Sequence, residues 1–232
     1  MFTVLFEITS VELILYFDGK ALLRTCTNGS SELMSNISMS LVSMLYNIQL
    51  LKYAGENGVA AYGVMMYVNF VFISMFIGYS IGSAPIIGYN HGAGNHKELK
   101  GLLRKSIAII SISSVVMLLL AFLLAAPLTD IFVGYDAELR ELTVHGFHIF
   151  AFSFLFAGFA IFGSNFFTAL NDGLTSALIS FLRTLVFQIA AVMLLPLIWE
   201  IDGIWYSVVV AEAMAVAVSV LFMIVKRKKF NY

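Results

Sequence analysis

A line of polar residues crosses an otherwise apolar stretch near the amino end of the chain. Glu32, Asn36, Ser40, Ser43 and Asn47 follow one another at steps of four, four, three and four residues. On an α-helix this spacing puts all five side chains on one face. The pattern favours a face that lines a polar cavity, where the carboxylate could take up Na⁺, H⁺ or an organic cation. The alternative is that Glu32 lies in the first helical turn, where the helix dipole favours an acidic residue.

Two other charged residues, Arg183 and Glu212, interrupt apolar stretches. Each lies about eight residues into its stretch, a depth of roughly 12 Å at 1.5 Å per residue. Because the two stretches enter a hydrocarbon core of about 30 Å from opposite sides, the two Cα levels differ by only about 6 Å. An unpaired charge in hydrocarbon is costly, so these depths predict a structural ion pair. The alternative is a coupling role for Glu212.

The apolar stretches carry no pattern typical of an enzyme. They contain no His-Glu-x-x-His, no Gly-x-Ser-x-Gly and no paired aspartates. Cys26 is the only cysteine, which excludes an internal disulfide and a cysteine-based metal site. We therefore expect no enzymatic activity, no cofactor and no metal other than Na⁺ at Glu32.

A glycine-rich segment contains two histidines, His91 and His96, but lacks a Walker pattern or a carboxylate pair that would complete a metal site. We interpret it as a helix end at Gly92 or Gly94. The basic residues that follow predict an amphipathic segment over 97–105 that lies on the membrane surface.

The composition requires a membrane. The chain has 232 residues, of which 60% are hydrophobic and 12% charged, and its mean hydropathy is +0.93. A soluble domain of this size could not bury so much apolar surface, and apolar runs near 20 residues select helices over a barrel. The sequence therefore predicts an all-α fold, a polytopic transmembrane bundle of about six helices. The expected spans are 33–51, 59–89, 106–128, 146–170, 175–198 and 204–225.

The basic residues sort by side when the predicted loops are assigned alternately to the two faces of the membrane. One side receives Lys20, Arg24, Lys97, Lys100, Arg104, Lys105 and the run 226–229, and the other receives only Lys52 and Arg140. By the positive-inside rule, both chain ends are expected to be cytoplasmic in a bacterial inner (cell) membrane. The net charge of −1 gives no support to a nucleic-acid partner.

The chain divides into one membrane domain with short flanks. We expect a six-helix lobe over 28–229, an interfacial or truncated segment over 1–27 and the end of a cytoplasmic tail over 230–232. Within the second span, the spacing Gly78-x-x-x-Gly82 would allow close helix packing.

Four short motifs carry a resemblance to a known family. They are the stretch from Pro85 to Asn95, Ala60-Ala61-Tyr62-Gly63, Ser180-Phe-Leu-Arg183 and Asp202-Gly-Ile-Trp205. In order and spacing they resemble the carboxyl-terminal lobe of multidrug and toxin extrusion (MATE) family antiporters, over about residues 28 to 226.

The resemblance implies a cation-coupled exporter of organic, often cationic drugs and toxins, built from two six-helix lobes. Glu32 matches the acidic residue of the family's seventh helix, so it is the first candidate for coupling to Na⁺ or H⁺. Asn36 and Glu212 are the other coupling candidates. The candidate cavity-lining residues are Ser40, Ser43, Asn47, Asn165 and Thr168, the last two at positions where relatives carry cavity residues.

Because one lobe is present, the expected partners are the lipid bilayer, a small organic substrate, and either a complementary six-helix lobe or a second copy of the chain. Two alternatives stay open. One is a lipid-linked oligosaccharide flippase of the same superfamily, against which the sparse Lys and Arg residues within the spans count. The other is a non-transporting membrane partner subunit.

Overall fold

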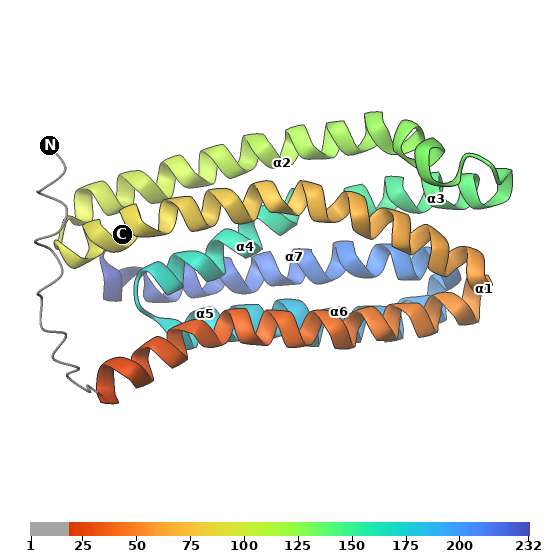
Figure 1. Cartoon of the computed structure of the whole chain (residues 1–232). Coiled ribbons are helices and arrows are strands. Elements are labelled where there is room, and N and C mark those ends of the chain that lie inside the picture. Colours follow the sequence, from red (N-terminus) through yellow and green to blue (C-terminus); the bar gives the residue numbers. More distant parts are fainter. Residues whose placement is uncertain (1–18) are drawn as a thin grey trace, which may run out of the picture.

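The chain folds as a bundle of helices (Figure 1). The computed structural model describes residues 19–232, apart from the side chains of residues 21, 24 and 27–35, so the expectation for the first segment lies largely outside the described residues. The elements are α1 (Gly19–Gly92), α2 (His96–Val133), α3 (Ala137–Ala151), α4 (Phe154–Ala169), α5 (Gly173–Phe181), the π-helix η2 (Leu182–Val186), α6 (Phe187–Leu194) and α7 (Pro196–Phe230). The described residues form no strand, and the predicted all-α fold is confirmed.

Helix α1 is two antiparallel helices joined by a sharp reversal. Its backbone leaves the helical region at Gly55, with φ of 62°. Glycine adopts this left-handed conformation without the steric cost of a side chain. We call residues 19–54 the first arm and residues 56–92 the second arm. Figure 1 shows the two arms running back along the bundle with other helices between and beside them.

The number of spans agrees with the sequence. Four helical stretches are long and apolar enough to cross a membrane, and the pair α3 and α4, bent by 50°, adds a fifth. Because α1 supplies two arms rather than one, the total is six. The chain is therefore a multi-pass membrane protein. The bend between α3 and α4 falls inside the span that we expected to be continuous over 146–170.

The loops alternate between the two ends of the bundle (Figure 1). The start of α1, the turn over 93–95, the turn over 170–172 and the end of α7 lie at one end, which we call the basic end. The reversal at Gly55 and the connection from α2 to α3 lie at the opposite end, as does the first part of α7, whose backbone leaves the helical region at Trp199 and Glu200.

The turn between α1 and α2 corrects one expectation. The predicted helix end is present, since α1 stops at Gly92 and Gly94 has a φ of +68°. The predicted separate segment on the membrane surface is wrong, because 97–105 is the first part of the continuous helix α2. The side chain of Asn95 caps this helix by accepting a hydrogen bond from the backbone N–H of Glu98 at 3.2 Å, which starts the helix before the basic residues.

Close packing accounts for two residues of the Asp202-Gly-Ile-Trp205 motif, Gly203 and Trp205. A Cβ on Gly203 would lie 2.4 Å from the carbonyl oxygen of Leu195, so the backbone at the start of α7 can pass there only without a side chain. Trp205 is fully buried, and a Cβ on Gly146 of α3 would lie 2.8 Å from its ring. The motif thus fixes how α7 passes α6 and α3.

Candidate functional site

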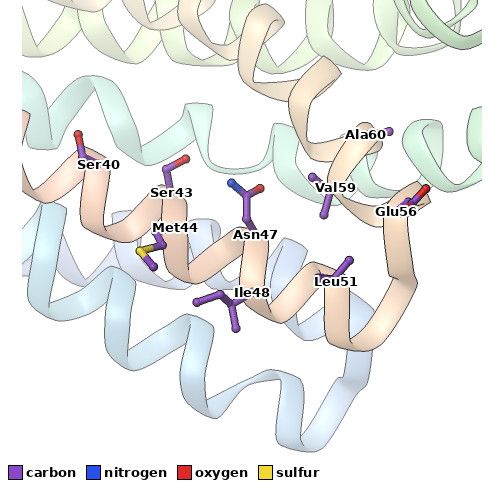
Figure 2. Close-up of a pocket in the computed structure, with 9 residues that line it drawn as sticks. All are labelled: Ser40, Ser43, Met44, Asn47, Ile48, Leu51, Glu56, Val59 and Ala60. Carbon is purple, nitrogen blue, oxygen red and sulfur yellow. The ribbon is translucent and has the colours of Figure 1, made fainter.

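A groove of about 810 Å³ opens between the two arms of α1, near their reversal. Figure 2 shows the side chains that line it, from both arms. We call it the arm groove. It is lined by Ser40, Ser43, Met44, Asn47, Ile48, Leu51, Glu56, Val59 and Ala60.

The predicted polar stripe contributes three of these residues. Ser40, Ser43 and Asn47 line the arm groove, and Ser40 and Asn47 are exposed. Asn36, one turn earlier on the same arm, is also exposed. Glu32 belongs to the helical backbone of the first arm, but its side chain is outside the described part of the chain. The described part of the stripe, from Asn36 to Asn47, therefore faces away from the core of the bundle, as a cavity lining would.

The other lining residues make the groove amphiphilic. Five of them are apolar, and Glu56 is the only charged residue among the described residues that line it. A carboxylate beside apolar and neutral polar side chains suits an organic molecule that carries a positive charge. Sequence reasoning missed Glu56 because it treated Gly55-Glu56-Asn57-Gly58 as a connecting loop. The Gly-x-x-Gly spacing could have indicated a tight reversal of the chain, and this reversal places Glu56 at the edge of the groove between the two arms.

Buried aromatic and amide side chains connect the first arm to its neighbours. The rings of Tyr46 and Tyr62 stack with centroids 5.2 Å apart, which joins the two arms. The hydroxyl of Tyr46 donates to Oε1 of Gln188 on α6 at 2.8 Å, and Nε2 of Gln49 contacts Sδ of Met193 at 3.3 Å. The first arm is therefore hydrogen bonded to α6 on the side opposite its polar stripe.

Arg183 and Glu212 are brought together in the interior. Nε of Arg183 lies 3.1 Å and 2.9 Å from the two carboxylate oxygens of Glu212, and Nη2 lies 2.9 Å from Oε1. The side chains are 18% and 7% exposed. Arg183 belongs to η2, and a π-helical turn inside an α-helix is frequent at functional positions.

The two residues expected from α4 do not line the arm groove. Asn165 donates to the carbonyl of Ile161 on its own helix at 3.1 Å. The hydroxyl of Thr168 lies 2.6 Å from that of Ser176, in a cluster where Ser164 also contacts the hydroxyls of Ser176 and Ser180 at 2.9 Å and 2.7 Å. These hydroxyls join α4 to α5.

An ion pair ties α7 to the turn between α4 and α5 at the basic end. Nζ of Lys226 lies 2.7 Å from Oδ2 of Asp172, and it also donates to the hydroxyl of Thr175. Burial by itself raises the pKa of Asp172, but hydrogen bonds from Lys226 and Thr175 and the charges of Lys226 and Lys229 together bring that pKa below its usual value.

The described residues contain no group of three or more His, Cys, Asp or Glu side chains that could hold a metal ion. What they do contain is a six-span helical bundle with an amphiphilic groove open on one side. This arrangement defines a polytopic α-helical membrane protein. The sequence model of the MatE family matches residues 33–194, and the chain belongs to that family.

Solved structures give the same fold. The MATE transporter VcmN of Vibrio cholerae in its bent form matches with a TM-score of 0.86 and 19% identity, over 96% of this chain and 50% of that one. A MOP superfamily transporter from Pyrococcus furiosus matches with a TM-score of 0.85 and 18% identity, over 95% of this chain and 50% of that one. An outward-facing multidrug resistance MATE family transporter matches with a TM-score of 0.85 and 19% identity, over 94% of this chain and 49% of that one.

The chain spans about half the length of the solved structures that it matches. No curated protein sequence matches it.

Proposed function

We propose that this chain is one lobe of a secondary active transporter that exports organic, often cationic compounds in exchange for Na⁺ or H⁺. The arm groove is the observation that carries the proposal. It is large enough for a small organic molecule, mixes apolar and neutral polar walls, and holds one described carboxylate, Glu56, and no described cation.

Coupling is assigned to Glu32. On the helical first arm it is two turns from Ser40, or about 12 Å along the axis, and on the same face. A carboxylate is neutral when protonated, and its ionised form is stabilised by Na⁺ or by a cationic drug. Proton or Na⁺ occupancy and drug occupancy therefore compete, and this competition is what an antiporter needs.

A complementary surface is needed to close the groove. Three of its four polar residues, Ser40, Asn47 and Glu56, are exposed, so a second six-helix lobe or a second copy of the chain would complete the cavity. The two lobes would then rock around the enclosed site. We place the assembly in a bacterial cell membrane with the basic end in the cytoplasm, because Lys97 to Lys105 and Lys226 to Lys229 gather there.

The flippase alternative is less well supported. A lipid-linked pyrophosphate would need cationic side chains in the cavity, and among the described residues the arm groove has neither Lys nor Arg. The carboxylate of Glu56 has the wrong sign for that substrate.

Blocking the groove tests the proposal. Ala60 is an exposed lining residue, so A60W should fill the arm groove, whereas A108W puts the same side chain on the exposed surface of α2 outside it. Export of a fluorescent cationic dye is measured in cells that produce the chain alone and with its complementary lobe, at equal membrane levels. We expect export to fall sharply in A60W and not in A108W. Equal export by both variants would remove the arm groove as the substrate path.

A further inference from the structure

A second groove, of about 330 Å³, runs between the second arm of α1 and α2 near the basic end. We call it the α1–α2 groove. Figure 1 shows these two helices side by side as they approach their common turn. It is lined by Tyr79, Gly82, Ser83, Ile86, Ile87, Leu102, Lys105, Ser106 and Ile109. The proposed transport path does not use it.

The groove is smooth because of a glycine. Gly82 is exposed, and a Cβ at this position or at Gly78 would meet no atom within 4 Å. The Gly78-x-x-x-Gly82 pair therefore does not pack against another helix within the described lobe. Exposed side chains of Ile81 and Ile86 flank Gly82 on the same arm. The floor of the groove at Gly82 is open and apolar, and it suits an extended hydrocarbon chain.

The polar groups of the groove come from both helices: Tyr79 and Ser83 from α1, and Lys105 and Ser106 from α2. The hydroxyl of Tyr79 donates to that of buried Ser106 at 2.9 Å. Lys105, next to Ser106, is exposed and lines the groove. Within the described part of the chain, Lys105 forms no salt bridge. The carboxylate of Asp172, in the α4–α5 turn at the same end of the bundle, is paired with Lys226 and Lys229 instead. An available ammonium group thus lies at the edge of an apolar trough.

The surroundings add positive charge. The first turns of α2 also carry Lys97, Lys100 and Arg104, all exposed, against the single acidic residue Glu98. None of these three cations has an ion-pair partner among the described residues. Basic pockets between transmembrane helices on the cytoplasmic side attract anionic lipid headgroups. The charge selects an anion, and the trough selects one that carries an acyl chain.

We propose that the α1–α2 groove binds one anionic phospholipid, with its phosphodiester at Lys105 and an acyl chain lying along Gly82. Lys105 and Gly82 lie at similar levels, each about ten residues or roughly 15 Å along its helix from the turn over 93–95. The phosphodiester at Lys105 would therefore lie beside Gly82, and the acyl chain would run from there past Tyr79 toward the bilayer centre. A zwitterionic lipid of the same chains has the same apolar fit but no net negative charge, so it should be held less firmly.

The test compares lipid retention in matched variants. The purified chain, alone and with its complementary lobe, is mixed with equal amounts of phosphatidylglycerol and phosphatidylcholine of identical chains, and bound lipid is counted by native mass spectrometry. K105Q removes the lining cation, and K100Q removes an exposed cation of the same helix that does not line the groove. G82L fills the trough, and G78L adds the same side chain one turn away. Circular dichroism checks that all five variants, K105R included, fold.

We expect the preference for phosphatidylglycerol to fall about fivefold in K105Q, to be kept in K105R and to change little in K100Q, since one basic residue near a lipid surface is worth about a factor of five. G82L should reduce retention of both lipids, and G78L should not. Equal losses in K105Q and K100Q would mean a diffuse basic surface and would overturn the site. So would unchanged lipid binding in G82L together with loss of the complementary lobe, because the groove would then hold a protein helix.

Discussion

The guanidinium of Arg183 engages both carboxylate oxygens of Glu212, which joins the π-helical turn η2 to the middle of α7. Both side chains are largely buried, so neither charge has water to replace its partner. Replacing only one of them leaves a buried charge without compensation, which costs about 3–5 kcal/mol. We expect R183M and E212Q each to lower the unfolding temperature of the detergent-solubilised chain by several degrees.

The paired variant R183M/E212Q provides the control for this prediction. If the two charges serve each other, removing both should cost less than the sum of the single losses. Additive losses would mean that each side chain has its own separate stabilising contacts.

Glu32 is predicted to be the coupling carboxylate. E32Q keeps the size and the hydrogen-bonding capacity of the side chain but removes its titratable charge, so dye export with the complementary lobe present should fall sharply while membrane insertion is preserved. Export and the pH or Na⁺ gradient dependence are measured together. If E32Q exports as well as the parent chain, the coupling role passes to Glu212 or to Glu56, and E56Q is the next variant to compare.

Gly146 is predicted to be irreplaceable because of Trp205. A methyl group at Gly146 would lie 2.8 Å from the indole ring, which is fully buried. Overpacking of this kind costs about 1–3 kcal/mol. Gly63 is the matched helical control, since a Cβ there meets nothing within 4 Å. Thermal unfolding should show G146A less stable than the parent and G63A equal or more stable; the same loss in both would exclude the indole contact as the cause.

Acid should weaken the bond between α7 and the α4–α5 turn. The pKa of Asp172 is lowered in the folded chain, so its contribution to stability is complete above its unfolded pKa of about 3.9 and is lost as the pH falls through the lower folded pKa. The difference in unfolding temperature between the parent chain and D172N should therefore be constant from neutral pH to about 5 and shrink below about 4. If the difference in unfolding temperature persists in strong acid, the stabilising contact between Asp172 and Lys226 does not depend on the negative charge of Asp172.

Much of the bundle follows from the sequence because membranes simplify the problem. Apolar length predicted six spans, and the alternation of the loops between them predicted which loops share an end of the bundle. The depth argument put Arg183 and Glu212 at similar levels, and the structure joins them. The bend between α3 and α4 carries no proline or charge at its break, so composition gave no signal for it.

The site was less predictable than the fold. The stripe through Ser40, Ser43 and Asn47 was visible because it follows helical periodicity, which is a local property. Glu56 enters the groove only because the backbone reverses at Gly55, and the bond from Tyr46 to Gln188 joins residues that are 142 positions apart. Such contacts depend on how the helices pack, which spacing along one helix does not encode.

The π-helical turn at η2 has a consequence for comparing this chain with its relatives. A π-helical turn contains one more residue than an α-helical turn, so it shifts the helix register by one position. Against a relative whose fifth span is an uninterrupted α-helix, residues before Leu182 and residues after Val186 cannot both be matched without a gap. An ungapped alignment that pairs Ser180 with its true counterpart would pair Gln188 with a residue one position away from its own counterpart. The roles of residues in this span should therefore be assigned from a structural superposition rather than from a sequence alignment.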